Sequence, residues 1–82
     1  MFTRRPLTLE EKSVYSANPI TAIGKHFILD PDSSDPLPYK VAGVKASEGK
    51  VIYEVLFAGC FHVEDLEQQE VEDMMDSSNI LE

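Results

Sequence analysis

The sequence feature that most constrains the fold is a run of β-forming residues, 51–58, that lies between two glycines. Alternate positions of this run place one wholly apolar set on a single face: Val51, Tyr53, Val55 and Phe57. The opposite face is interrupted only by Glu54. Branched and aromatic side chains fit a pleated surface and lose rotamer freedom in a helix. The run therefore predicts a central strand that is covered on both faces for part of its length.

A second strand is predicted directly after this run. Gly59 tolerates positive φ and allows the chain to reverse, and Phe61 and Val63 resume a two-residue alternation. Residues 49–67 are therefore expected to form a hairpin around which the rest of the chain is organised.

Upstream of the hairpin, the sequence predicts a short helix and two further strands. Thr8 and Glu11 have the spacing of a capping box, so a helix is expected over about residues 9–16, ending at Asn18-Pro19. Strands are expected over residues 20–29, with a bend at Gly24, and over residues 39–44. The proline-rich and aspartate-rich residues between them, 30–38, predict an exposed loop, and residues 46–49 predict a turn.

The order of these segments resembles SH3-like barrels of the Tudor and KOW kind over about residues 20 to 67. The resemblance depends on Gly24 before the first strand, Tyr39-Lys40-Val41 in a middle strand, and Val63-Glu64-Asp65-Leu66 at the end. It implies a mainly β fold: a small SH3-like barrel or a strongly bent antiparallel sheet of about four strands. The domain organisation expected from it is an N-terminal arm with a short helix (1–19), the β domain (20–67) and an acidic C-terminal helix or tail (68–82). The layout and the acidic end also resemble small accessory proteins of bacteriophages.

Length and composition favour one small domain without a deep active site. The chain has 82 residues, so its core is small. Hydrophobic residues make up 43% of it, which is typical of a folded globular protein. Its single cysteine excludes an intramolecular disulfide, and no apolar stretch has the length of a signal peptide or a membrane span. A cytoplasmic location is expected, in the host cytoplasm if the protein is viral, with no membrane partner.

Residue patterns for catalysis or metal binding are weak. Cys60 and His62 have the spacing of two metal ligands or of a nucleophile and base, but only His26 and carboxylates remain to complete a site. Residues 30–41 begin like a calcium loop, but the sixth position is Asp35 where a glycine is needed. No catalytic, cofactor-binding or metal-binding residue is predicted, and no enzyme activity.

The net charge of −8 is concentrated at the C-terminus. Residues 1–61 contain seven basic and seven acidic residues, whereas residues 62–82 contain eight acidic residues and no lysine or arginine. The chain also lacks the basic loops with which KOW-type modules bind nucleic acid, so direct nucleic-acid binding is not expected. A single-sign block of this kind attracts cationic partners.

The acidic segment is the main functional lead. An apolar stripe through Val63, Leu66, Val71 and Met75 predicts a helix from about Glu64 to Asp76. The predicted partner-binding residues are Glu64, Asp65, Glu67, Glu70, Glu72, Asp73, Met74 and Asp76.

Three interpretations of this segment stay open: a solvated helix that closes the barrel, a mimic of nucleic-acid phosphates, and a helix that packs in a groove or against a second copy. The favoured prediction is a non-enzymatic protein-binding module, such as a phage-type inhibitor that occupies a basic, nucleic-acid-binding surface of a host protein. The alternative is an SH3-like reader, or a structural or oligomerisation subunit, with a solubilising tail. A reader would need an aromatic cage, for which the candidates are Tyr39, Tyr53, Phe57 and Phe61.

Overall fold

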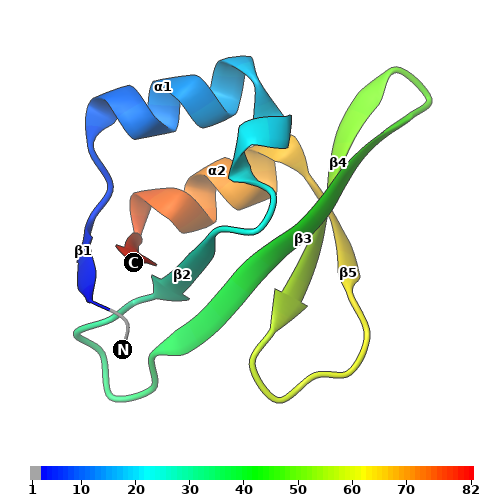
Figure 1. The fold of residues 1–82 in the computed structure, drawn as a ribbon. Coiled ribbons are helices and arrows are strands. Elements are labelled where there is room, and N and C mark those ends of the chain that lie inside the picture. The colour runs from blue at the N-terminus through cyan, green and yellow to red at the C-terminus, as the bar shows by residue number, and fades with distance from the viewer. Residues whose placement is uncertain (1–2) are drawn as a thin grey trace.

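The computed structural model describes residues 3–82 and contains six strands, two α-helices and one 3-10 helix (Figure 1). In chain order the elements are β1 (Arg4–Pro6), α1 (Leu9–Ala17), η1 (Pro19–Ala22), β2 (His26–Leu29), β3 (Leu37–Ser47), β4 (Lys50–Phe57), β5 (Glu64–Glu67), α2 (Gln68–Asp76) and β6 (Ser78–Leu81). The prediction of a mainly β fold with a helix near each end is confirmed.

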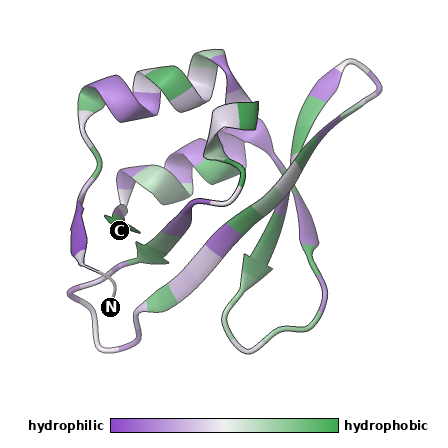
Figure 2. Ribbon diagram, in the orientation of Figure 1, coloured by the Kyte–Doolittle hydropathy of each residue, from purple (hydrophilic) through white to green (hydrophobic). Residues whose placement is uncertain are grey.

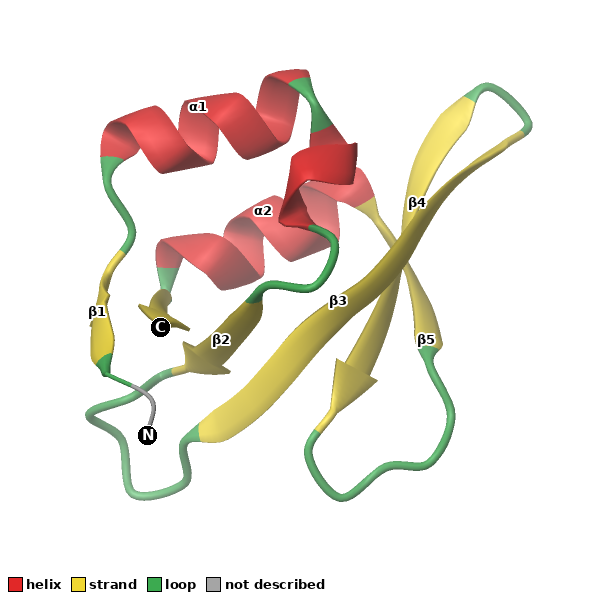
Figure 3. Ribbon diagram, in the orientation of Figure 1, coloured by secondary structure: helices red, strands yellow, loops and turns green. Residues whose placement is uncertain are grey.

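All six strands form one open antiparallel sheet in the order β1-β6-β2-β3-β4-β5 (Figure 3). The sequence predicts about four strands, and the two additional ones are β1 and β6. Both are too short to show an alternating pattern of their own, and they form because they pair with each other and with β2. Residues 4–6 and 78–81 therefore belong to the same sheet as β2, β3, β4 and β5.

Both α-helices and η1 cover one face of the sheet, which we call the covered face. The buried core on this side includes Tyr15 of α1, Ala22 of η1, and Val71 and Met75 of α2. From the strands it receives Phe27, Tyr39, Val41, Tyr53, Val55 and Ile80. Figure 2 shows hydrophobic and hydrophilic residues alternating along the helices and strands, as expected for elements with one buried side.

The alternation predicted for residues 51–58 is confirmed on the covered face. Tyr53 and Val55 are fully buried, and Val51 and Phe57 pack against the core. The predicted covering of both faces is wrong, because no helix within residues 3–82 packs on the other side, where Ile52 and Leu56 are half-buried. We call that side the open face.

Two predicted strand positions are also corrected. Residues 20–22 belong to η1, because Pro19 favours a helical start and Gly24, at φ +86°, reverses the chain before β2 begins at His26. After β4, the strand predicted around Phe61 and Val63 begins only at Glu64. The connection over residues 58–63 leaves the side chain of Phe61 95% exposed.

The local signal for the first helix is confirmed. The turn predicted at 46–49 is confirmed only at Glu48 and Gly49, because β3, predicted over 39–44, extends from Leu37 to Ser47. The Thr8 hydroxyl accepts from the backbone N–H of Glu11 at 3.0 Å, and the Glu11 carboxylate accepts from that of Thr8 at 2.9 Å. In the turn, Glu48 and Gly49 both have positive φ, which is the geometry of a tight two-residue hairpin connection.

Candidate protein-binding surfaces

The acidic segment forms a strand followed by a helix, so the prediction of one helix from Glu64 is wrong at its start. Glu64 and Glu67 pair with Val55 and Ile52 at the sheet edge, and the helix α2 begins only at Gln68. Residues 64–67 form a strand and not a helix because their backbone N–H and C=O groups hydrogen-bond to the edge of β4. The sequence pattern does not reveal this edge.

All four acidic residues of α2 lie away from its buried side. Val71 and Met75 are buried, and Met74 is half-buried against the core. With 100° between successive residues, Asp73 and Asp76 lie opposite the buried side, and Glu70 and Glu72 lie on the two flanks of the helix. We call these four residues the acidic surface. Glu64 lies at the other end of β5, away from them.

Four of the C-terminal acids form ion pairs with basic residues from the earlier part of the chain. The Lys45–Asp65, Lys50–Glu67 and Lys12–Asp76 pairs have N···O distances of 2.8, 3.1 and 3.4 Å, and Glu82 pairs with Arg5. The hydrogen bond to Asp65 raises the pKa of Lys45. About half of the C-terminal negative charge is therefore compensated within the molecule.

The remaining carboxylates have no ion pair with a basic residue within residues 3–82. On the acidic surface these are Glu70, Glu72 and Asp73. Glu70 accepts from the backbone N–H of Glu67 at 3.4 Å, and Asp73 accepts from the amide of Gln69 at 3.0 Å. Local hydrogen bonds thus hold the Glu70 and Asp73 carboxylates in place without neutralising their charges.

One carboxylate of the acidic surface acts on a buried tyrosine. Burial, and to a smaller extent the Glu72 carboxylate, raise the pKa of Tyr53 to about 12. Glu72 itself is half-buried on α2, the helix that contacts β4.

Other candidate site residues do not assemble. Cys60 and His62 are exposed in the loop after β4, whereas His26 is half-buried on β2. Among residues 3–82 there is no group of three or more His, Cys, Asp or Glu side chains that could hold a metal ion. Of the aromatic-cage candidates, Tyr39 and Tyr53 are buried, so they are not available to a ligand.

The open face carries a second surface, which sequence analysis missed. Residues directly opposite each other in an antiparallel sheet share a face, and the registers connect one row across five strands. From β1 to β4 this row consists of Arg4, Leu81, His26, Lys40 and Leu56. We call it the basic row. No sequence signal could have found it, because its members come from five separate segments.

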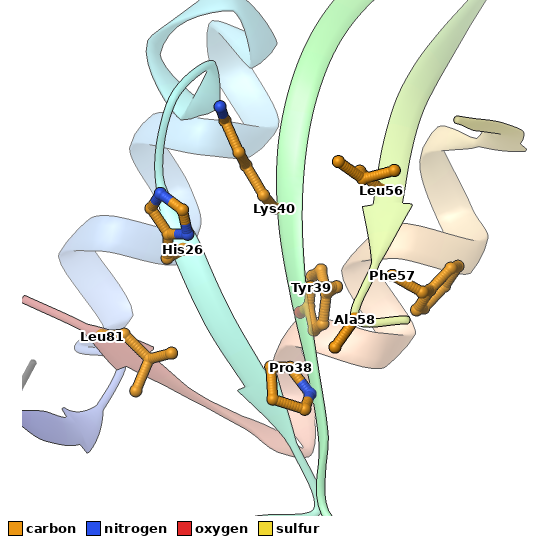
Figure 4. Close-up of a pocket in the computed structure, with 8 residues that line it drawn as sticks. All are labelled: His26, Pro38, Tyr39, Lys40, Leu56, Phe57, Ala58 and Leu81. Atoms are coloured by element: carbon orange, nitrogen blue, oxygen red, sulfur yellow. The ribbon is translucent and has the colours of Figure 1, made fainter. Parts of the chain in front are cut away.

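A hollow of about 200 Å³ lies along the basic row (Figure 4). Leu81, Pro38 and Leu56 contribute apolar side chains from three different strands, and His26 and Lys40 form its basic side. No acidic residue lines it. The hollow can therefore accept an apolar group next to a negative charge.

Comparison with family models, with curated proteins and with solved structures finds no match to this chain. Among the described residues, no helix has the length and apolar character needed to cross a membrane. The two surfaces must therefore be interpreted from their own chemistry.

Proposed function

We propose that this chain is a non-enzymatic protein-binding module whose acidic surface occupies a basic surface of another protein. The observation that carries the proposal is that Glu70, Glu72 and Asp73 form no ion pair with a basic residue of the described chain, although neighbouring acids do. The three carboxylates are fixed on a helix that Val71 and Met75 anchor in the core. A partner would therefore meet a preorganised anionic surface.

The free protein is not at an electrostatic optimum on this helix. Glu70 and Asp73 lie three residues apart in α2. At this spacing a pair of like charges destabilises a helix by about 0.2–0.5 kcal/mol. A cationic partner removes this repulsion, and the surrounding field accelerates association in a salt-dependent way.

In its most specific form, the proposal treats the carboxylates as substitutes for nucleic-acid phosphates. The partner would then be a nucleic-acid-binding protein, and binding would inhibit it, as the resemblance to bacteriophage accessory proteins implies. The proposal also assigns an SH3-like arrangement to the β domain. It is supported by the order of β2, β3, β4 and β5, which are consecutive antiparallel neighbours in the sheet.

Two variants of equal charge test the acidic surface. The first is Glu70→Gln, Glu72→Gln, Asp73→Asn, and the control is Asp65→Asn, Glu67→Gln, Glu82→Gln, which removes three carboxylates that are already paired. Binding of a short oligolysine peptide is measured by calorimetry at increasing ionic strength. We expect the first variant to weaken binding about tenfold or more, and the control to retain most of it. Equal losses would show that only net charge matters and would overturn the proposal.

The ion pairs of the C-terminal segment favour a second candidate function. Lys45–Asp65 and Lys50–Glu67 join β5 to the β3–β4 hairpin, and Lys12–Asp76 joins the two helices. If the main role of the C-terminal acidic residues is to stabilise the fold through these ion pairs, the chain is a structural or oligomerisation subunit. The control variant would then destabilise the fold, and the first variant would change neither stability nor binding.

A further inference from the structure

Charge is divided unevenly over the open face. The basic row contains Arg4, His26 and Lys40, and the adjacent row on the same face, Pro6, Asn79, Ile28 and Pro38, contains no charged residue. The acids of this face lie further along β4 and β5, at Glu54, Asp65 and Glu67. Asp65 and Glu67 are paired with lysines, and Glu54 lies over Gly43. A chain of net charge −8 thus keeps one end of its open face basic.

The cations of the basic row are available to a partner. Arg4 donates one hydrogen bond, at 3.2 Å, to the backbone carbonyl of Pro31, which leaves most of its donors exposed. Lys40 forms no ion pair within residues 3–82. Between these cations the row contains Leu81, which offers apolar surface and lines the hollow, and His26.

We infer that the basic row docks an extended acidic segment of a partner protein, with acidic side chains on Arg4 and Lys40 and an apolar side chain between them. Arg4 and Lys40 are separated by three inter-strand spacings, about 14 Å in total. In an extended peptide, side chains at positions 1, 3 and 5 share a face, and positions 1 and 5 are about 13 Å apart. A peptide of the form acid-x-apolar-x-acid therefore matches the row when it lies across the strands.

Charge complementarity selects this occupant over two others. A second copy docked through the same face would bring two basic rows together, which like charge opposes. A nucleic acid would meet only two lysine or arginine side chains in the row, Arg4 and Lys40, and an overall charge of −8. This docking site is independent of the acidic surface on α2, so either one can fail without the other.

The test is a titration of the isotope-labelled full chain with the blocked peptide Glu-Thr-Leu-Thr-Glu, followed by amide chemical shifts. We expect saturable shifts confined to β1, β2, β3, β4 and β6, and binding at least tenfold weaker for the peptides Lys-Thr-Leu-Thr-Lys and Glu-Thr-Ser-Thr-Glu. The variant Lys40→Glu should weaken binding at least tenfold. The matched control Lys25→Glu changes an exposed lysine that belongs to a different hollow, beside α1, and should leave binding unchanged.

Several results would overturn the inference. The first is equal binding to the Lys40→Glu and Lys25→Glu variants, and the second is a set of shifts that maps elsewhere on the protein. The third is concentration-dependent shifts in the basic row without peptide, which would assign this face to a second copy. The fourth is stronger shifts with oligothymidylate than with the peptide, which would assign it to nucleic acid. Because the spectrum of each variant also reports whether it is folded, loss of binding through unfolding is detected directly.

Discussion

The covered face and the open face are built from alternate residues of the same strands, yet they have different chemistry. On β3, Tyr39 and Val41 point into the core while Lys40 lies on the open face, and on β4, Tyr53 is fully buried while Leu56 is half-buried. The covered face contains a chain of aromatic contacts, and the open face contains cations, leucines and ion pairs. Stability and binding are thus assigned to opposite sides of one sheet, so each can be changed with little effect on the other.

The largest expected effect comes from removing the central aromatic ring of the covered face. Phe27 is fully buried, with its ring centroid 6.1 Å from that of Tyr15 and 5.3 Å from that of Tyr39. Phe27→Ala should lower the free energy of unfolding by about 3–5 kcal/mol. A domain of this size has about 4–12 kcal/mol in total, so the variant should be close to unfolding. Urea denaturation followed by circular dichroism measures the change.

The matched change on the open face is Leu56→Ala, which also shortens an apolar side chain on the sheet. Since Leu56 is only half-buried and lies outside the core cluster, we expect a loss of about 1 kcal/mol or less. Equal losses from the two substitutions would mean that the open face is part of the folding core, and the division between the faces would have to be abandoned.

Alkaline pH should destabilise the protein mainly through the covered face, because all three tyrosines lie there. Burial raises the pKa of Tyr39 and of Tyr53 to about 12, and it also raises that of Tyr15. A folded-state pKa above the ordinary value of 10 means that the stabilisation is fully present below pH 10 and is lost as the pH rises toward 12. We expect the free energy of unfolding to fall by more than about 2 kcal/mol between pH 10 and pH 12.

Tyrosinate absorbance and circular dichroism, recorded together during the titration, check this prediction. The absorbance should rise only as the protein unfolds, at a pH above the ordinary tyrosine value. Ionisation of most tyrosines near pH 10 with an intact circular dichroism spectrum would show that the covered face is open to solvent.

Local chemistry explains which parts of the fold were predictable. The β4 alternation, the capping box of Thr8 and Glu11 and the turn at Gly49 each depend on residues close in sequence, and each is confirmed. The strands β1 and β6 depend on pairing between opposite ends of the chain, for which the sequence contains no local signal.

The same distinction applies to the two surfaces. The acidic residues of β5 and α2 are close together in the sequence, so their charge was evident. The ion pairs that Asp65, Glu67 and Asp76 form with Lys45, Lys50 and Lys12 were not. The basic row could not be predicted at all, since Arg4 and Lys40 come into one row only because β6 and β2 pair between their strands.

The smallest expected change in stability comes from the side chains of β1. Arg4 and Arg5 are adjacent in sequence but lie on opposite faces of this strand. Arg5 pairs with Ile80 on the covered side, and its guanidinium donates to both oxygens of Glu11 at 2.7 and 2.8 Å. These bonds, together with the backbone N–H of Thr8, lower the pKa of Glu11 from its ordinary value of 4.5 to about 2. Arg4 makes no ion pair in the described part of the chain.

Because the folded-state pKa of Glu11 is lowered, its stabilisation is present above about pH 4.5 and is lost as the pH falls toward 2. Glu11→Gln should therefore cost about 1 kcal/mol at neutral pH, a value reduced by solvent screening, and nothing near pH 2. Arg4→Gln should leave the free energy of unfolding within about 0.5 kcal/mol of the original at both pH values, while weakening the binding of the acidic peptide. Urea denaturation at the two pH values measures both changes. An Arg4→Gln variant that lost as much stability as Glu11→Gln would show that Arg4 supports the fold, and the basic row would lose one of its two outer contacts.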